Sequence, residues 1–221
     1  EICQICSSKK INKVMDFGYQ PLADDLTSFN EKSKKTAFYP LEVFLCKKCV
    51  LLQTGYIVGD TTLYNKNYHY LPGISKAVVD NFKNLSLNLK KIYNLNNLST
   101  VVDVGCNDGT LLGEFKKIGI KKVLGIEPTN TYKYAQKKNI KTINDFFNVK
   151  SSIKAKKVYG KVDLIVTTNV FAHSNKLGDF INAAKNLINK NGTFVIENHY
   201  LGSVLDGNQF DTFYHEHPRT Y

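Results

Sequence analysis

Four of the five cysteines form two pairs with the same spacing. Cys3 and Cys6 make one C-x-x-C pair near the start of the sequence, and Cys46 and Cys49 make a second. Each pair can turn two thiolates toward one point, and two such turns complete the tetrahedral sulfur shell of a structural Zn²⁺ site. Disulfides and a redox-active pair are the alternatives, but a reducing compartment disfavours disulfides and a redox motif needs a strand before it. The cysteines therefore predict a zinc ion that stabilises the fold.

A glycine-rich turn follows an apolar run in the middle of the sequence. Gly105 and Gly109 are spaced G-x-x-x-G, with Asp103 before them and Asn107 between them. Glycine lets the backbone approach a ligand closely, and the next expected strand ends at Glu127, where a carboxylate can accept both hydroxyls of a ribose. The dinucleotide pattern G-x-G-x-x-G is not met, and the acids would repel a pyrophosphate. The acids therefore favour a site for an adenosine cofactor that carries an ammonium and a sulfonium group. The alternative is that they are ordinary surface acids.

A second group of candidate residues follows two later strands. Asn169 and His173 come after the strand expected at 162–167, where an open parallel sheet binds its ligands. The C-terminal candidates are consecutive and carry polar or titratable groups: Tyr214, His215, Glu216 and His217. Such a cluster supplies proton acceptors near neutral pH and groups that orient them. A metal site is the alternative, although the H-E-x-x-H spacing of zincins is not met.

The pattern of apolar residues predicts the elements that carry these groups. Strands are expected at 100–104, 122–126, 140–143, 162–167 and 192–197, and helices at 75–93, 110–118, 132–138 and 176–188. Strands that alternate with helices of this length predict an α/β fold with a parallel, doubly wound sheet. Short apolar runs at the start predict a small β-rich module that needs a metal for stability. We expect a zinc-binding domain at 1–66, a helical linker at 67–98 that begins near an N-cap at Ser75, and a Rossmann-like domain at 99–221.

With these motifs in view, the sequence resembles the class I S-adenosylmethionine-dependent methyltransferases. The segment from Asp103 to Gly109 matches the first motif of that family, and Glu127 matches the second. Asp145 and Phe146, after the third strand, resemble its adenine site. The resemblance implies a class I methyltransferase fold and S-adenosylmethionine as the cofactor.

The sequence also resembles a narrower family, the zinc-containing C-methyltransferases that act on nucleotide-linked deoxysugars. The resemblance is carried by both cysteine pairs, Tyr68-His69-Tyr70, the segment from Asp103 to Gly109, the segment from Asn169 to His173, and the segment from Gln209 to His217. It implies a nucleotide-linked keto-sugar as the substrate.

The resemblance implies a role for each candidate residue. A base removes the proton beside the sugar ketone, and the resulting enolate accepts the methyl group. His217 is the expected base, assisted or oriented by Tyr214 and Glu216, while His173 and Asn169 face the sugar near the ketone oxygen. The expected substrate contacts are Tyr68, Tyr70 and His215.

Two segments depart from the family pattern. Residues 71–75 read Leu-Pro-Gly-Ile-Ser where the family usually has a pair of serines, and Pro218 and Arg219 follow His217 in place of an aliphatic residue. Both border the expected sugar site, so they leave open which sugar is used and which position is methylated. The sequence ends at Tyr221, before the last two strands and the C-terminal domain of family members, which predicts a C-terminally incomplete chain.

Composition narrows the classes of function. Hydrophobic residues make up 43% of the 221 residues, so a disordered chain is excluded. There is neither an apolar run long enough to cross a membrane nor a secretory signal, so we expect a cytoplasmic protein without a membrane partner. The net charge of +11 favours anionic ligands such as a nucleotide diphosphate.

Two other functions were compared with C-methylation. In a zinc-knuckle module that binds nucleic acid, basic residues would cluster with aromatic ones, whereas here the lysines are scattered along the whole chain. That function is therefore disfavoured, and nucleic acid is not expected as a partner. O- or N-methylation of a sugar or small metabolite is the main alternative, because it needs the same cofactor but no ketone.

Overall fold

The computed structural model describes residues 1–26, 29, 36–65 and 68–221. The contacts divide the chain into two compact units. The first unit consists of Glu1–Leu63, Ala172–Asn175 and Asn198–Tyr221, and the second of Tyr64–Phe171 and Lys176–Glu197. Each is described below by itself.

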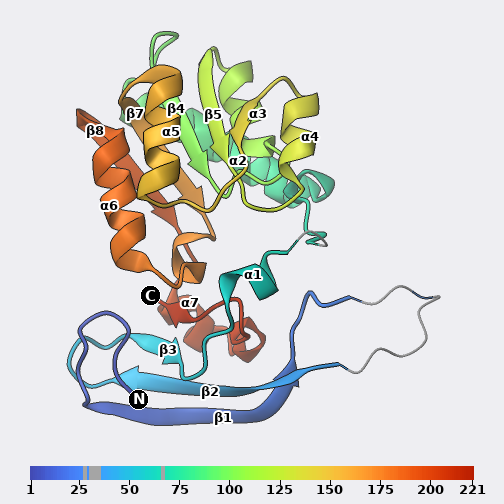
Figure 1. Cartoon of the computed structure of the whole chain (residues 1–221), viewed down its shortest axis with the longest axis vertical. Helices are drawn as coiled ribbons and strands as arrows, with labels where there is room; N and C mark the ends of the chain where they lie inside the picture. The colour runs from blue at the N-terminus through green and yellow to red at the C-terminus, as the bar shows by residue number, and fades with distance from the viewer. Residues whose placement is uncertain (27–28, 30–35, 66–67) are drawn as a thin grey trace. The chain divides into compact units, whose positions relative to one another are not determined.

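The second unit contains a parallel sheet of five strands in the order β6-β5-β4-β7-β8 (Figure 1). Its strands are β4 (Thr100–Val104), β5 (Lys122–Ile126), β6 (Lys141–Ile143), β7 (Val162–Thr168) and β8 (Ile188–Glu197). Its helices are η1 (Pro72–Ile74), α2 (Lys76–Ile92), α3 (Thr110–Lys117), α4 (Tyr132–Lys137), α5 (Val149–Tyr159) and α6 (Leu177–Leu187). The strand order reverses beside β4, so the carboxyl ends of β4 and β7 flank the point where doubly wound sheets bind ligands. The predicted fold class is confirmed.

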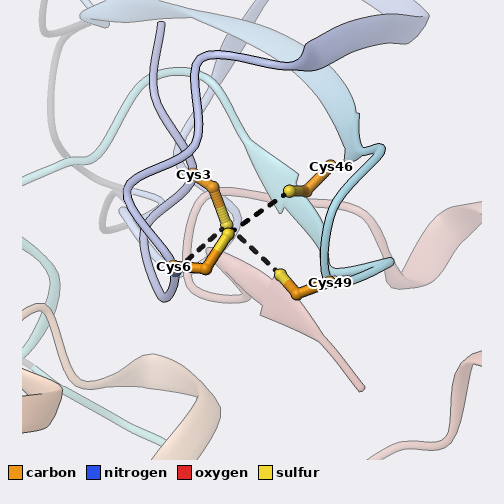
Figure 2. A group of neighbouring side chains, drawn as sticks. All are labelled: Cys3, Cys6, Cys46 and Cys49. Atoms are coloured by element: carbon orange, nitrogen blue, oxygen red, sulfur yellow. Dashed lines mark hydrogen bonds between the residues drawn. The ribbon is translucent and has the colours of Figure 1, made fainter.

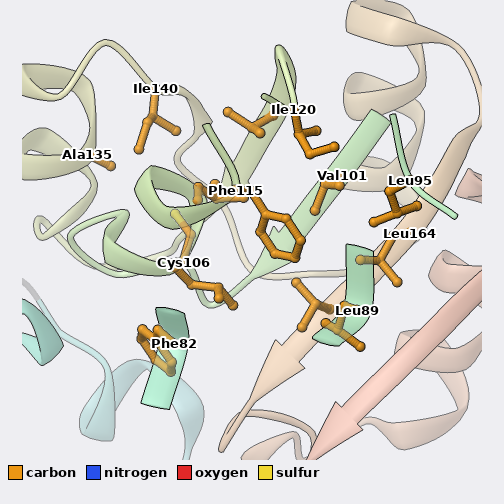
Figure 3. Packing of buried hydrophobic residues seen from close by; sticks show 14 residues of the cluster. Phe82, Leu89, Leu95, Val101, Cys106, Phe115, Ile120, Ala135, Ile140 and Leu164 are labelled. Carbon is orange, nitrogen blue, oxygen red and sulfur yellow. The ribbon is translucent and has the colours of Figure 1, made fainter. Parts of the chain in front are cut away.

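Helices cover both faces of this sheet because neighbouring strand residues point to opposite sides. Val101 of β4 packs in one cluster with Phe82 of α2 and Phe115 of α3 (Figure 3). Val102, the next residue, packs in the other cluster with Phe180 of α6. Helices α2, α3 and α4 therefore cover one face, and α5 and α6 cover the other.

Helix α2 belongs to the core of the second unit. Ser75 caps it as predicted, since its hydroxyl accepts a hydrogen bond from the backbone N–H of Val78. Phe82 and Leu89 are buried on the face that meets α3. The segment expected to be a helical linker thus supplies one of the covering layers. The sequence reasoning also passed over α5, whose start is marked by a capping box of Asn148 and Ser151.

The first unit is built on an antiparallel sheet of four strands in the order β1-β2-β3-β9. Its elements are β1 (Ile11–Pro21), β2 (Phe38–Cys46), β3 (Leu52–Thr54), α1 (Asp60–Leu63), η2 (Phe171–His173), which reaches back one residue into the second unit, α7 (Leu201–Asp206), η3 (Phe210–Thr212) and β9 (Arg219–Thr220). The last strand, β9, comes from the other end of the chain.

The C-terminal segment completes the core of the first unit. Val43 of β2 and Leu52 of β3 pack with Val204 of α7 and with Phe213. A sheet of three strands buries too little apolar surface alone, and these side chains supply the missing part. The contacts therefore divide the chain differently from the expected boundaries, because residues 198–221 join the N-terminal module and not the sheet of the second unit. Within the described residues, no helix is long and apolar enough to cross a membrane.

Candidate functional site

The glycine-rich turn of the second unit has a backbone that only small or flexible residues adopt. Gly105 and Gly109 have φ angles of +73° and +74°, and Asn107 between them has +49°. A Cβ on Gly109 would lie 2.7 Å from Cδ1 of Ile140 and 2.8 Å from Cβ of Ala135. Both the left-handed angle and the close packing therefore require glycine at this position. The turn connects β4 to α3 at the carboxyl edge of the sheet.

Glu127 is bound to this turn from the end of β5. Its side chain is 4% exposed, and Oε2 accepts a hydrogen bond of 2.9 Å from the backbone N–H of Asn107. Oε1 accepts from the backbone N–H and the hydroxyl of Thr129, at 2.8 and 2.6 Å. Burial raises the pKa of Glu127, and these hydrogen bonds oppose that shift. A carboxylate has about four acceptor positions, so Oε2 retains the capacity to accept a ligand hydroxyl.

Asp103 is the most deeply buried acid of the turn. It is 2% exposed, and within the described residues its Oδ1 has no hydrogen-bond partner. Burial and the negative charges of Glu127 and Asp108 raise the pKa of Asp103 well above its usual range. A cation placed here would reverse that shift and satisfy the orphaned oxygen. These acids consequently fit a ligand that carries positive charge, such as the ammonium or sulfonium of S-adenosylmethionine.

The segment that precedes α2 is fastened to the same turn. The side-chain amide of Asn107 donates a hydrogen bond of 2.9 Å to the carbonyl of Tyr70. The backbone N–H of Gly73 donates to Oδ2 of Asp108 at 3.2 Å, and Lys138 forms an ion pair with that oxygen at 3.3 Å. Tyr70, which precedes the segment where the sequence departs from the resembled family, and Gly73 within that segment therefore lie against the glycine turn. Burial, with the charge of Asp108, raises the pKa of Tyr70.

The expected adenine contacts follow β6. Asn144 donates hydrogen bonds to the carbonyls of Glu127 and Pro128, at 2.8 and 2.9 Å, and so ties the ends of β5 and β6 together. Asp145, next in the chain, forms an ion pair of 2.8 Å with Lys154, and Phe146 is half-buried. Asp145 and Phe146 remain predicted contacts.

The four cysteines of the two pairs meet in the first unit. Figure 2 shows their sulfur atoms pointing toward one another. Sγ of Cys3 lies 3.5 Å from Sγ of Cys49, Sγ of Cys6 lies 3.6 Å from Sγ of Cys46, and all four lie within 4.8 Å of one another. Zn–S bonds of about 2.3 Å place tetrahedral sulfurs about 3.8 Å apart, so the four thiols fit Zn²⁺. The backbone N–H of Cys49 is the main cause that lowers the pKa of Cys46 to about 6, whereas burial and the neighbouring cysteines raise the pKa of Cys49.

A cluster of imidazole rings lies elsewhere in the first unit. The ring centroid of His217 is 4.8 Å from that of His173, 4.5 Å from that of His199 and 4.1 Å from that of Tyr214. Nδ1 of His217 lies 2.9 Å from the carbonyl oxygen of Thr212, to which it must donate. Nε2 of His217 therefore accepts the hydrogen bond of 3.0 Å from the hydroxyl of Tyr214.

These histidines are held neutral. Burial is the main cause that lowers the pKa of His173 to about 3 and that of His217 to about 4. Burial also lowers the pKa of His199. The charges of His217, His199 and Arg219 add to the shift of His173, and the charge of His199 adds to the shift of His217, because neighbouring cations would repel. At neutral pH the cluster therefore offers lone pairs and N–H donors without positive charge.

Other predicted residues lie outside this cluster. Glu216 pairs with Asp24. Burial and the negative charge of Asp24 raise the pKa of Glu216 to about 8. His215 packs edge-on against Tyr39, with Nε2 3.3 Å from the carbonyl of Pro40. Within the described residues, only the four cysteines form a group that could hold a metal, so the alternative metal site at the C-terminal string gains no support.

The remaining predicted residues belong to the second unit. Asn169 has a φ angle of +53° and is exposed, and its backbone N–H donates to the carbonyl of Glu197. Tyr68 packs edge-on against Tyr64, with ring centroids 5.7 Å apart. Sequence reasoning passed over His199, although it follows the expected strand at 192–197, and that position after a parallel strand could have identified it.

Family models match most of the chain. Residues 3–64 match a model described as "Putative zinc binding domain", and residues 74–221 match one described as "Methyltransferase domain". The chain belongs to this methyltransferase family. The predictions of a methyltransferase domain with S-adenosylmethionine as its cofactor and of an N-terminal zinc-binding domain are confirmed.

The chain is also similar to a curated protein and to solved structures. The C-methyltransferase NovU of Streptomyces niveus is 27% identical over 216 residues, which cover 97% of this chain and 51% of NovU. DesVI of Streptomyces venezuelae has 17% identity and a TM-score of 0.46, over 66% of this chain and 59% of that chain. A SAM-dependent methyltransferase of Anabaena variabilis has 18% identity and a TM-score of 0.49, over 60% of this chain and 57% of that chain. The present chain spans about half the length of the curated relative it matches.

Proposed function

We propose that the protein methylates a carbon beside the ketone of a nucleotide-linked deoxysugar, with S-adenosylmethionine as the methyl donor. Membership of the methyltransferase family and the similarity to NovU, which is named a C-methyltransferase, support this activity. The net charge of +11 suits a substrate with a nucleotide diphosphate. The cytoplasmic location expected from the sequence stays a prediction.

The paired side chains of Tyr214 and His217 are the observation that carries the proposal. Nε2 of His217 has a lone pair directed at the hydroxyl of Tyr214, 3.0 Å away. The Tyr214 oxygen can therefore take the proton from the sugar carbon while its own proton moves to His217. The carbonyl of Thr212 then stabilises the imidazolium through its hydrogen bond to Nδ1. The C–H bond breaks, and its electron pair becomes the enolate.

The neighbouring groups suit an enolate for electrostatic reasons. His173 is neutral, so it can donate a hydrogen bond to the ketone oxygen without competing for the proton. Negative charge that develops on the substrate would raise the low pKa of His217 and strengthen it as a base during the reaction. We assign Asn169 to the same oxygen, and Tyr68, Tyr70 and His215 to substrate contacts.

The acids of the second unit hold the cofactor in this proposal. Glu127 would accept the ribose hydroxyls through Oε2, and Asp103 would balance the positive charge. Asp145 and Phe146 would contact the adenine. When bound, S-adenosylmethionine would supply an electrophilic methyl group on a positively charged sulfur.

Deuterium wash-in separates proton abstraction from methyl transfer. Each of a panel of nucleoside-diphosphate-linked keto-deoxysugars is incubated with the protein in D₂O without S-adenosylmethionine, and exchange at the sugar carbon is followed by NMR. We expect His217→Asn to slow the exchange by about 100-fold or more while S-adenosylhomocysteine still binds. The matched control is Glu127→Gln, which should weaken S-adenosylhomocysteine in calorimetry and leave the exchange intact.

The same experiment can overturn the proposal. Methyl transfer to an oxygen or nitrogen, without wash-in for any keto-sugar, would establish the alternative of O- or N-methylation. Wash-in that persists in His217→Asn would show that another group is the base.

A further inference from the structure

Arg219 is the only arginine in a sequence whose other basic residues are lysines. It is 2% exposed in β9, where it lies opposite Gln53 of β3. Burial lowers the pKa of its guanidinium, and Tyr221 and Asp60 oppose that shift. A buried cation is costly unless it is hydrogen-bonded, so its partners indicate what it does.

Arg219 binds two acceptors that are far apart in the sequence. Nη1 donates a hydrogen bond of 3.1 Å to the side-chain carbonyl of Gln4, and Nη2 donates to the backbone carbonyl of Ser174. Lysine has a single ammonium and lacks the planar fork that reaches two separated acceptors. This geometry explains why the one arginine stands at this position.

Gln4 is part of the first cysteine turn, between Cys3 and Cys6. Its backbone N–H donates to Oε1 of Gln53 at 2.8 Å, and its Nε2 donates to the carbonyl of Thr54 at 2.9 Å. The side-chain amide therefore cannot rotate without losing bonds, and its oxygen is fixed toward Arg219. The conformation of the cysteine turn thus determines where the guanidinium lies.

Ser174 connects the other end of this link to the imidazole cluster. It follows His173, the last residue of the single 3-10 turn η2, so a bond to the Ser174 carbonyl restricts the backbone that carries the His173 ring. The next residue of β9 acts in parallel, because the hydroxyl of Thr220 lies 3.2 Å from Nε2 of His199. Strand β9 thereby contacts the cysteine turn, His199 and the residue that follows His173.

We propose that Gln4 and Arg219 are positioning residues through which the metal-bound cysteine turn holds the backbone at His173, and that metal occupancy therefore controls the geometry of the imidazole cluster. The residues Gln4, Arg219 and Ser174 are called the positioning link. The expected effect of this link on catalysis rests on the proposed function of His173 and His217. Its expected effect on the position of the histidine rings does not.

The test measures the histidine rings directly. Proton–carbon correlation spectra of ring-labelled histidines are recorded for the zinc-loaded protein and for Gln4→Leu and Arg219→Lys, which keep all four cysteines. We expect both variants to retain one zinc per chain and to shift the His173 and His217 ring signals. Removal of zinc with a chelator should shift the same signals in the same direction. Gln20→Leu is the matched control, because the side chain of Gln20 is exposed and, among the described residues, donates a hydrogen bond to the carbonyl of Phe17 in its own strand.

Kinetics then separate positioning from a general loss of structure. If the keto-sugar is methylated, kcat should fall about tenfold or more in both link variants, with an unchanged KM for S-adenosylmethionine. The double variant should lose no more than the worse single variant, since both changes break one link. Zinc-loaded variants with unchanged ring signals would overturn the proposal, as would unchanged signals after zinc removal. Shifted signals in a protein that transfers no methyl group would support the link and refute the proposed function.

Discussion

His173 and His217 lie in an environment that opposes their protonation. Burial is the main cause that holds the pKa of His173 near 3 and that of His217 near 4, and the charge of His199 adds to both shifts. A base that is neutral at physiological pH is ready to accept a proton. The same environment makes the stability of the first unit depend on pH.

We predict that stability falls as the pH is lowered from about 6.5 to about 3. In the unfolded chain these histidines bind protons near pH 6.5, whereas in the folded protein they stay neutral until the pH reaches about 4 for His217 and about 3 for His173. The unfolded state thus binds more protons across that interval. Urea unfolding at pH 7, 6, 5 and 4 measures the effect, and the curve of His173→Gln should be flatter than that of the wild type. Equal slopes for the two proteins would refute the assignment.

At the scale of elements, the segment before α2 is joined to the glycine turn. The amide of Asn107 and the carboxylate of Asp108 bind the backbone of Tyr70 and of Gly73, so two hydrogen bonds hold this segment beside the expected cofactor site. A Cβ on Gly73 would collide with Oδ2 of Asp108 and would lie 2.7 Å from the hydroxyl of Thr110. Glycine at position 73 is therefore needed for the close approach.

We predict that Gly73→Ala weakens S-adenosylhomocysteine binding by about tenfold. The added methyl group displaces Asp108 and breaks its bond to the backbone, a loss of about 1.4 kcal/mol. Calorimetric titration gives the affinity. The control is Gly178→Ala in α6, where a Cβ meets nothing within 4 Å and the affinity should not change. Equal affinities for the two variants would show that this segment does not support the cofactor site.

At the scale of the whole molecule, the chain ends complete one unit together. The cysteine turns, β9 and the imidazole cluster all belong to the first unit, whereas the glycine turn and Glu127 belong to the second. Phe213 and Val204 close the apolar core beneath β2 and β3. The metal and the C-terminal segment should therefore stabilise the same unit.

We predict that removing zinc loosens the first unit selectively. Without the metal, four thiols lose their common partner, and a small sheet depends on its limited apolar core. Hydrogen exchange measured by mass spectrometry should rise in β2, β3 and β9 and stay unchanged in β4, β5 and β7. Binding of S-adenosylhomocysteine should persist. Uniformly faster exchange in both units, or no change in either, would contradict this division.

The second unit was the part most readily predicted from the sequence. Five parallel strands, the N-cap at Ser75 and the glycine turn at Gly105 and Gly109 depend on residues that are neighbours in the chain. Helix α5 was passed over because its surface is rich in lysine and its apolar pattern is weak. The consecutive residues Tyr214 to His217 were expected to act as one group, yet they separate in the structure. Their string contains a turn, in which the backbone N–H of His217 donates to the carbonyl of Tyr214 and brings those two side chains together.

The amino-acid sequence by itself determined the two cysteine pairs, the glycine turn and the alternation of strands and helices, because each is a matter of residue type at short spacing. Only the tertiary structure decided that Glu216 pairs with Asp24 and that His199 joins His173 and His217. It also decided that Gln4 meets Arg219 across 215 positions of sequence. Such contacts depend on how β9 pairs with β3 and on which apolar residues complete the first core. Those are properties of packing between distant segments, which no local pattern records.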